Sequence, residues 1–263
     1  MKLSVIIPVL NERDSLPATI AALRACRVNS ASVSSAANTE RASETMISEI
    51  IISDGGSTDG TVEWVRGQQD LILVDSAPGK GPQLNAGAAR ATGDTLLFLH
   101  ADCLVSRPAL DALHSALRDI EFAGVPVPAV EVLGGAFYVR FAERRPRSLH
   151  IVAWGINLRA RLRNSATGDQ GIFVRRDIFH TVGGAPDWPL FEDVELVRRI
   201  KQAGKFVVLN PPLTISGRRY LAHGVWHTVF LVYFLRFAYW LGVPPQRLKN
   251  WFRDARTDQK SRD

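Results

Sequence analysis

The chain has 263 residues, of which 46% are hydrophobic and 22% are charged, as expected for one large globular domain or for a domain with an appendage. Two cysteines, Cys26 and Cys103, are too few for a disulfide framework, which excludes a small disulfide-rich secreted protein. The first residues have the character of a strand rather than of a signal peptide. We therefore expect a cytoplasmic protein.

The positive charge of the chain is concentrated in one segment. Residues 140–163 contain seven arginines and a single acid, Glu143, so the segment alone matches the net charge of +6 of the whole chain. A basic segment favours an anionic partner such as phosphate or lipid headgroups, and a solvated helix face is the alternative. No nucleic acid partner is expected, because no helix-turn-helix, zinc or aromatic RNA-binding signature accompanies the arginines.

Alternating strand and helix signals predict an α/β fold with a mostly parallel central sheet flanked by helices. Short runs of β-branched and aliphatic residues predict buried strands at 3–10, 49–53, 71–75, 95–99, 133–141 and 206–209, and residues 167–175 predict a polar turn that enters another short strand. Helical spacing of apolar residues predicts helices after Ser15, around Val62 and Val65, from Gly79, over 107–120, in the basic segment and over 191–203. The Ser-, Ala-, Asn- and Thr-rich residues 27–48 predict a mobile surface loop.

Ligand-type side chains follow the predicted strand 95–99, where His100 and Asp102 come directly after a buried apolar run. In an open α/β sheet, ligands bind outside the carboxyl ends of the strands, so an acid placed there can meet a substrate. The alternative for Asp102 is a loop acid that helps to begin the next helix.

Two further strand ends carry polar residues. Asp54 ends one strand and precedes two glycines, so it can either bind a ribose or base or form a turn in which Ser57 or Thr58 caps the next helix. Lys80 begins a helix of small residues and could meet phosphate oxygens, although its glycine spacing is not that of a Walker loop.

An amphipathic helix is predicted over 191–203, with Gly204 as its stop and a buried stripe made of Val194, Val197 and Ile200 or Ala203. Glu192 and Asp193 lie in its first turn, where acids complement the helix dipole. Because adjacent helical residues are about 100° apart around the axis, the two carboxylates cannot do the same job. One of them can face a crevice.

Five motifs resemble, in order, the signatures of the family 2 glycosyltransferases with the GT-A fold. They are VIIPVLNE (5–12), ISDGGSTD (52–59), GKGPQLNAG (79–87), FLHAD (98–102) and FEDVEL (191–196). The likeness covers residues 3–215. We take residues 1–215 as the GT-A domain, followed by a C-terminal apolar and basic helical segment at 216–263. The forms FLHAD and GDQGIFV (168–174) are most similar to the branch labelled arsenosugar-biosynthesis glycosyltransferases.

The resemblance implies inverting transfer of a sugar from a nucleotide-diphosphate sugar, expected to be uridine-linked, to a hydroxyl of an unidentified acceptor. The residues implied in donor binding are Pro8, Glu12, Asp54, Lys80 and Asp102. Those implied on the acceptor side are Gln170, Gly171 and Glu192, with Asp193 as the general base. The chemistry agrees, because a cation can neutralise the departing diphosphate while a base on the opposite face takes the hydroxyl proton.

The resemblance also implies a divalent metal, bound by Asp102. The usual motif has two acids, whereas His100 stands at the first position. Either the imidazole binds the metal or the nucleotide, or Asp102 acts alone. A nitrogen ligand would favour Mn²⁺ over Mg²⁺, so both ions remain candidates. His223 is a further candidate ligand, with a surface histidine as the alternative.

The most apolar stretch, 226–243, is interrupted by Arg236 and is shorter than the roughly 20 residues that a membrane span requires. Trp and Tyr near its ends suit a membrane interface, so peripheral association with the inner face of the membrane is one expectation. A buried helix that covers the acceptor side and a homodimer that hides this surface are the others.

The sequence leaves two alternative functions open. A nucleotidyltransferase could use the same fold, although no dinucleotide-type glycine-rich signature follows the first strand. A non-catalytic protein that binds a membrane surface could use the basic and aromatic segments. Turnover of the donor separates these functions.

Overall fold

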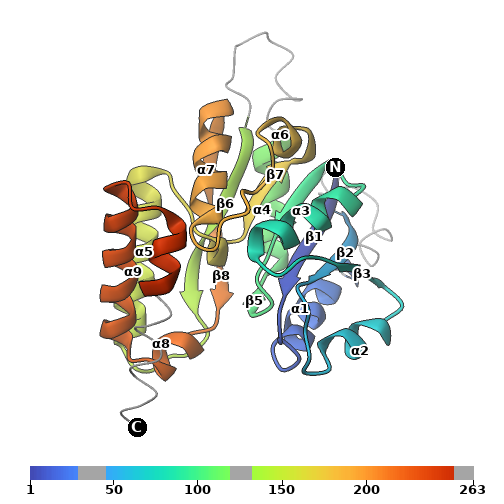
Figure 1. The fold of residues 1–263 in the computed structure, drawn as a ribbon. Coiled ribbons are helices and arrows are strands. Elements are labelled where there is room, and N and C mark those ends of the chain that lie inside the picture. Colours follow the sequence, from blue (N-terminus) through green and yellow to red (C-terminus); the bar gives the residue numbers. More distant parts are fainter. Residues whose placement is uncertain (29–45, 119–131, 252–263) are drawn as a thin grey trace.

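The computed structural model describes residues 1–28, 46–118 and 132–251, which form one sheet with helices around it (Figure 1). The strands are β1 (Lys2–Val9), β2 (Met46–Asp54), β3 (Leu71–Asp75), β4 (Thr95–Phe98), β5 (Cys103–Leu104), β6 (Val132–Phe141), β7 (Ile172–Arg175) and β8 (Lys205–Ile215). The helices are α1 (Leu16–Val28), α2 (Thr61–Arg66), α3 (Lys80–Arg90), α4 (Arg107–Arg118), α5 (Ser148–Arg163), the 3₁₀ turn η1 (Gly168–Gln170), α6 (Arg176–Thr181), α7 (Glu192–Ala203), α8 (Arg218–Ala222) and α9 (Val225–Trp240).

The sheet is mostly parallel, as the sequence predicts. Its strand order is β3-β2-β1-β4-β7-β6-β8-β5. Strands β3, β2, β1 and β4 are parallel neighbours, and β6 and β8 run in the same direction, while β7 and β5 are antiparallel to their partners. The carboxyl ends of six strands therefore lie along one edge, which is where this fold can bind a ligand.

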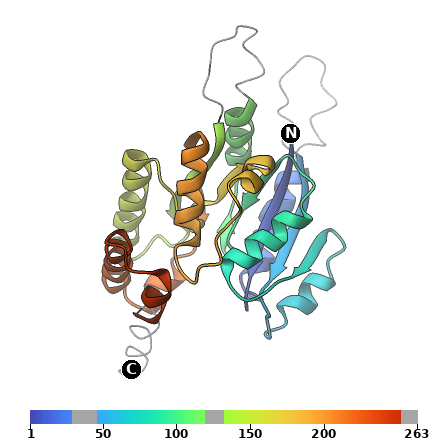
Figure 2. The same ribbon diagram turned by 45° about the horizontal axis from the view of Figure 1, so that its top comes forward.

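Both faces of the sheet are buried, which explains the unbroken apolar runs in its central strands. Along β1, Val5 and Ile7 pack with residues of α1, α2 and α4, whereas Ile6 packs with residues of α3, α6 and α7. The two sets of helices lie on opposite faces of the sheet in Figures 1 and 2. Strand β6 lies close to its neighbours, because a Cβ at Gly135 would be 2.3 Å from the Phe173 ring and 2.4 Å from the Val207 carbonyl oxygen.

Helix α5 makes a side-chain hydrogen-bond contact with strand β6 of the sheet. The Asn157 amide accepts a hydrogen bond from the Val139 N–H and donates one to the Val139 carbonyl, each at 2.9 Å. Asn157 thereby satisfies backbone groups of β6 that the neighbouring strands leave open. This contact places the inner face of α5 beside the carboxyl end of β6.

The apolar stretch near the C-terminus forms helix α9, which is buried on one side only. Leu235 and Ala238 pack with Phe191 and Leu248, and this cluster connects α9 to the start of α7. The opposite side exposes large side chains, which are Trp226, Phe230, Tyr233, Phe234, Phe237 and Trp240. Helices α5 and α9 lie side by side in Figure 1. Over the residues that the structure describes, the helices are all too short or too polar to cross a bilayer.

Several local predictions need correction. Ser57 and Thr58 do not cap α2, whose N-cap is Gly60, because the Ser57 hydroxyl accepts a hydrogen bond from the Asn11 N–H instead. Ala203 is exposed at the end of α7, so the buried stripe of that helix consists of Leu196, Val197 and Ile200, while Val194 packs toward the α9 cluster.

The sequence also misses β5, α6 and α8, which are too short to show a hydrophobic period. Most of the predicted mobile loop 27–48 lies outside the described residues. Of the rest, Arg27 and Val28 belong to α1, and residues 46–48 begin β2. The predicted domain boundary at residue 215 coincides with the end of β8.

Candidate functional site

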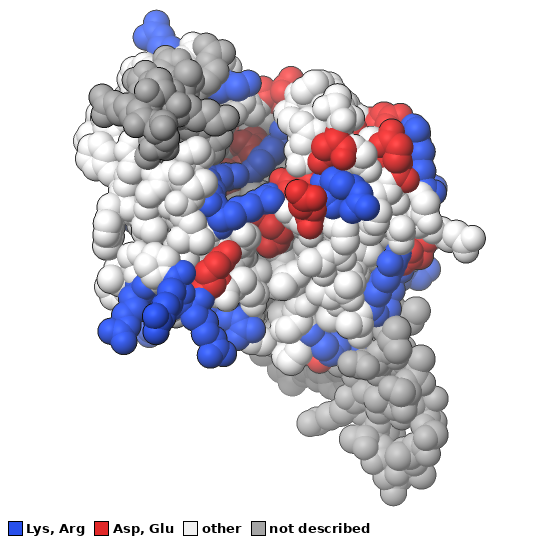
Figure 3. Space-filling view, turned by 90° about the horizontal axis from the view of Figure 1, so that it is seen from below, with Lys and Arg blue, Asp and Glu red and all other residues white. Residues whose placement is uncertain are grey.

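A cavity of about 410 Å³ lies between the carboxyl ends of the parallel strands and the helices α5, α7 and α9. Figure 3 looks onto this edge of the molecule and shows a hollow in which basic and acidic side chains lie close together. The predicted site residues that line the cavity are Lys80, His100, Asp102, Glu192 and Asp193. The fold thus brings together residues from α3, from the loop after β4 and from the start of α7.

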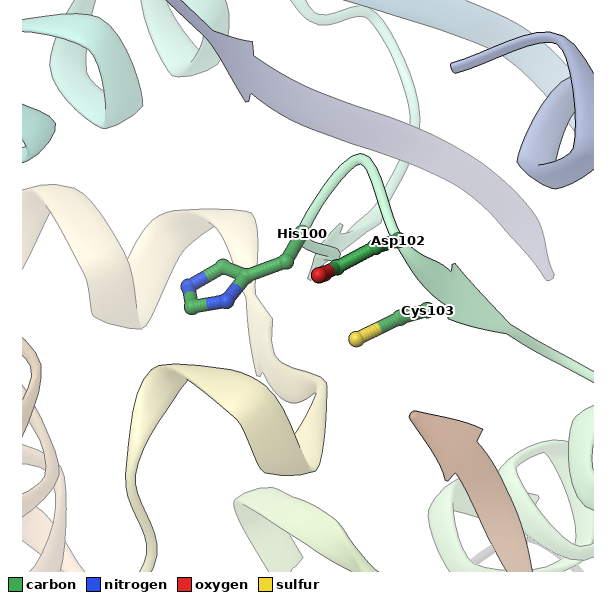
Figure 4. A group of neighbouring side chains, drawn as sticks. All are labelled: His100, Asp102 and Cys103. Atoms are coloured by element: carbon green, nitrogen blue, oxygen red, sulfur yellow. The ribbon is translucent and has the colours of Figure 1, made fainter. Parts of the chain in front are cut away.

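His100, Asp102 and Cys103 project from the turn that connects β4 to β5 (Figure 4). The turn is held in place by the Thr19 hydroxyl, which donates a hydrogen bond of 2.7 Å to the Ala101 carbonyl. One ligand-type atom from each of the three side chains lies within 4.8 Å of the others. This is the only such group of His, Cys, Asp or Glu side chains in the described ranges.

The His100 imidazole is neutral and accepts a hydrogen bond. Burial lowers the pKa of His100 well below its ordinary value, and the charges of Lys80 and Arg219 lower it further. The Lys80 ammonium lies 3.1 Å from His100 Nε2. Because an ammonium group can only donate, Nε2 is the acceptor in this contact.

Asp102 lies beside Arg218, a residue that the sequence did not assign to the site. Arg218 Nε is 3.4 Å from Asp102 Oδ2, and Arg218 Nη2 donates a hydrogen bond of 2.6 Å to Glu12. Burial raises the pKa of Asp102, and the charge of Arg218 opposes this shift. Arg218 also donates to the Ser15 hydroxyl, so the loop before α8 is tied to the turn after β1.

The other residues predicted to bind the nucleotide lie beside the cavity. Pro8 and Asp54 are at the ends of the neighbouring strands β1 and β2. The Asp54 carboxylate is 5% exposed and accepts hydrogen bonds from the N–H groups of Gly56 at 2.8 Å and Ser57 at 3.0 Å. Pro8, Glu12 and Asp54 are absent from the described residues that line the cavity. Asp54 shapes the turn after β2 through these bonds, and its role in nucleotide binding stays a prediction.

The first turn of α7 supplies the two carboxylates on the far side of the cavity. Asp193 Oδ2 accepts a hydrogen bond of 2.5 Å from the Gly168 N–H, and Oδ1 accepts one of 2.7 Å from the Val194 N–H. A Cβ at Gly168 would lie 2.8 Å from His100 Nε2 and 3.3 Å from Asp193 Oδ2. Gly168 therefore lies between His100 and Asp193, where a larger side chain would contact both.

The three acids of this helix start have different surroundings. Glu195 forms ion pairs with Arg198 and Arg199 at 2.7 and 2.9 Å, and these hydrogen bonds lower its pKa. Glu192 is 6% exposed, and burial together with the charge of Asp193 raises its pKa to about 7, although Lys80 opposes the shift. Glu192 therefore titrates near neutral pH.

Glu192→Gln is expected to change how stability depends on pH. Between pH 4.5 and 7 the folded protein keeps a proton that the unfolded chain releases, so the free energy of unfolding falls as pH rises through this window. The full loss is roughly 3 kcal/mol at most. The variant should differ little from wild type at pH 5 and should be more stable at pH 8.

Urea unfolding at both pH values measures this difference. Glu63→Gln is the matched control, because Glu63 is an exposed acid in the first turn of α2. Equal pH slopes for Glu192→Gln and wild type would contradict the shifted pKa of Glu192.

Two residues predicted on the acceptor side lie beneath the cavity. Gln170 is fully buried, donates to the Phe137 carbonyl at 3.0 Å and accepts from Arg159 Nη2 at 2.7 Å. A Cβ at Gly171 would lie 2.5 Å from Leu213 Cδ1. Neither residue is among the described ones that line the cavity. Gln170 orients the Arg159 side chain, which does line the cavity, and the acceptor-side role of both residues stays a prediction.

The basic segment divides into an outer and an inner part. Six of its arginines are exposed, which agrees with a solvated face, and these are Arg140, Arg144, Arg145, Arg147, Arg161 and Arg163. Arg159 alone turns toward the cavity, where Arg219 and Arg236 also lie. His223 caps the end of α8 and belongs neither to the cavity lining nor to the His100 group within the described ranges.

Sequence alone did not assign Arg159, Arg218, Arg236 or Asp169 to the site. The sequence shows the turn 216–220 and the basic segment, but no local pattern indicates which of their side chains face the cavity. In the structure, the hydrogen bond to Gln170 positions Arg159, and the ion pair with Glu12 positions Arg218.

Comparisons with known proteins agree with this architecture. The family model described as glycosyl transferase family 2 matches residues 4–183. A comparison with curated proteins found no match. Among solved structures, TarS (1–349) from S. aureus is similar with a TM-score of 0.56 and 16% identity over 87% of this chain. The chain spans 64% of that TarS chain, which is less than two thirds of it.

Two further structures are similar. The mannosyltransferase PcManGT from Pyrobaculum calidifontis, in complex with GDP-Man and Mn²⁺, has a TM-score of 0.54 and 22% identity, covering 94% of this chain and 67% of its own. Glucosyl-3-phosphoglycerate synthase from Mycobacterium tuberculosis, in complex with Mn²⁺, UDP-glucose and phosphoglyceric acid, has a TM-score of 0.50 and 19% identity, covering 80% and 72%. At these identities the likeness shows the fold.

The matched segment includes the strand ends that carry His100 and Asp102, and it ends before α7. The structural neighbours extend the likeness over most of the remaining chain and share the GT-A arrangement predicted from the five motifs. Because the family model covers more than half of its residues, this chain belongs to glycosyl transferase family 2.

Proposed function

We propose that the protein transfers a sugar from a uridine-diphosphate sugar to a hydroxyl of an acceptor, with inversion at the anomeric carbon. The observation that carries this proposal is the meeting of Asp193 with Lys80, His100 and Asp102 in one cavity. It is supported by the TarS structure in complex with UDP-GlcNAc and by the synthase bound to UDP-glucose. Membership of the arsenosugar-biosynthesis branch rests on residues 98–102 and 168–174 and is part of the proposal.

Asp193 is proposed as the general base. A single displacement needs one group that takes the acceptor proton as the new glycosidic bond forms and the bond to the diphosphate breaks. The Gly168 and Val194 N–H groups hold the Asp193 carboxylate in place. Lys80, beside His100, and Arg218, beside Asp102, supply positive charge that would stabilise the leaving diphosphate as its charge develops.

The residues around Asp102 fit a divalent cation in part. The Asp102 carboxylate and the neutral His100 imidazole are suitable ligands. Cys103 is the least suitable of the three, because a soft sulfur ligand suits neither Mn²⁺ nor Mg²⁺. A bound Mn²⁺ or Mg²⁺ would neutralise the charge of the leaving diphosphate. Mn²⁺ is present in two of the similar structures.

His100→Asp is expected to retain transfer activity and to shift the metal preference toward Mg²⁺. An oxygen ligand in place of the imidazole makes the site harder, and hard oxygen ligands suit Mg²⁺. The ratio of kcat/KM with Mg²⁺ to kcat/KM with Mn²⁺ should rise at least several-fold. His150→Asp, at an exposed position of α5, serves as the control. An unchanged ratio would remove His100 from the metal site.

The test of the proposed function is a screen of UDP- and GDP-sugars for thermal stabilisation, with and without Mn²⁺. A ligand that binds only the folded state at about 100 times its Kd stabilises it by roughly 2.7 kcal/mol. Metal-dependent stabilisation by a UDP-sugar, followed by its hydrolysis or transfer, is the expected result. Pyrophosphate release from a nucleoside triphosphate would indicate a nucleotidyltransferase, and lipid binding without turnover would indicate a non-catalytic membrane-surface protein.

A further inference from the structure

The cavity has a second wall that the proposed transfer chemistry does not use. This wall consists of apolar side chains of α5 and α9, among them Ile151, Trp154, Trp226, Val229 and Val232. The helices approach closely here, because a Cβ at Gly155 would be 3.8 Å from the Tyr233 hydroxyl. This wall therefore presents more apolar surface than the binding of a sugar hydroxyl requires.

The aromatic residues at the mouth of the cavity are exposed to solvent. Trp154 is 64% exposed and Trp226 is 59% exposed, although both line the cavity. Each Trp carries a large apolar surface, and burying that surface under an apolar ligand stabilises a complex by roughly 25 cal/mol per Å². The mouth is thus suited to hold a hydrocarbon or aromatic group.

Two guanidinium groups lie deeper in the same cavity. Arg236 of α9 lines it and has no hydrogen bond or ion pair with any residue in the described part of the chain. Arg159 Nη2 donates to Gln170, but its buried Nε has no partner there. Burial, followed by the charge of Arg159, lowers the pKa of Arg236 to about 10.

The acids in the cavity offset only part of this charge. Asp169 and Asp193 act on Arg236 through their charges, yet neither is bonded to it. Arg159 Nε is buried without a hydrogen bond, which is unfavourable, and Arg236 is partly buried beside it; an anionic ligand with two acceptor oxygens would satisfy these guanidinium groups. Lys80 and Arg218, the cations proposed for the donor diphosphate, lie beside His100 and Asp102. Of the other cavity cations Arg219 is exposed, so the partly buried Arg236 and Arg159 are the ones we assign to the acceptor.

We propose that the acceptor is an amphiphile, with an apolar body that lies between α5 and α9 and an anionic group that binds Arg236. Its hydroxyl would then lie toward Asp193, at the polar end of the same cavity. This inference rests on the proposed function, because the cavity is an acceptor site only if the protein transfers a sugar.

Dodecyl phosphate, used below its critical micelle concentration, is the probe for the test. Calorimetric titration of the full chain should show saturable binding at one site. Arg236→Gln and Trp154→Ser should each weaken this binding by roughly 10-fold or more, as expected for a buried charge contact and an aromatic anchor. Arg236→Lys keeps the charge but loses the two-pronged hydrogen bonding, so it should weaken binding less than Arg236→Gln does, and inorganic phosphate alone should bind far more weakly.

Matched controls separate the cavity from the exposed surface. Arg161→Gln removes an exposed arginine of α5, and Trp240→Ser removes a tryptophan of α9 that is 77% exposed and outside the cavity lining. Both should change the Kd by less than about 2-fold. The inference is overturned if Trp240→Ser weakens binding as much as Trp154→Ser, if Arg236→Gln binds like wild type, or if inorganic phosphate binds as tightly as dodecyl phosphate.

Binding of UDP-glucose with Mn²⁺, measured on the same proteins, keeps the two proposals apart. Donor binding should survive in Arg236→Gln and Trp154→Ser, which also shows that these variants fold. Loss of dodecyl phosphate binding with intact donor binding would support the acceptor assignment. Absence of donor binding in the wild type would count against the proposed function, whatever the amphiphile does.

Discussion

Asp193→Asn is expected to lower the rate of sugar transfer by roughly 10²–10⁴-fold, while the affinity for the nucleotide sugar stays nearly unchanged. Asparagine keeps one oxygen that can accept the Gly168 N–H bond, but its amide nitrogen cannot accept the Val194 N–H bond, and the side chain cannot take the acceptor proton. The variant should therefore keep the fold at the expense of one local hydrogen bond and lose its chemistry. Single-turnover transfer at saturating donor, together with the melting temperature, measures both properties.

The alternative role for Asp193 is that of an acid in the first turn of a helix. In that case the substitution would cost about 1 kcal/mol or less of stability and leave turnover unchanged. Asp177→Asn is the matched control, because Asp177 lies in the first turn of α6 outside the cavity lining. A wild-type rate in Asp193→Asn, combined with a large loss in Glu192→Gln, would transfer the base role to Glu192, whose pKa of about 7 suits it.

Asp102→Asn is expected to abolish the metal dependence of donor binding while the fold persists. The affinity for Mn²⁺ in the presence of UDP should fall by at least about 10–100-fold, the size found even for side chains that only support a metal ligand. The amide has no negative charge to offer a cation, whereas Arg218 keeps its ion pair with Glu12. Calorimetric titration with UDP and Mn²⁺ gives the affinity directly.

Asp111→Asn is the control for this substitution. Asp111 forms a salt bridge of 2.9 Å with Arg107 on α4 and does not line the cavity. It should bind UDP and Mn²⁺ like the wild type. Unchanged metal-dependent affinity in Asp102→Asn would remove Asp102 from the metal site, and a large fall in melting temperature would show that the ion pair with Arg218 is structural.

The strand ends could be located from the sequence, because their signal is local. A strand buried on both faces reads as an unbroken apolar run, so the point where the run stops is visible without a structure. This placed His100 and Asp102 after β4 and Asp54 at the end of β2, as the structure has them. The amphipathic period of α7 placed Glu192 and Asp193 at a helix start in the same way.

The sequence could not distinguish a side chain that faces a substrate from one that supports the turn beside it. Asp54 and Gln170 both occur in the motifs that resemble the family, yet the structure engages each of them in hydrogen bonds with their surroundings. A motif shows which residue type stands at a position, whereas its hydrogen-bond partners depend on segments elsewhere in the chain.

Sequence by itself determined the α/β alternation, the mostly parallel sheet and the acids at the start of α7, because each depends on a hydrophobic period of neighbouring residues. The tertiary structure alone decided that Arg218 reaches Glu12 and Asp102, that Gly168 separates His100 from Asp193, and that α9 is buried on one side only. These contacts join segments far apart in the chain, and packing of the helices against the sheet sets them, which no local period encodes.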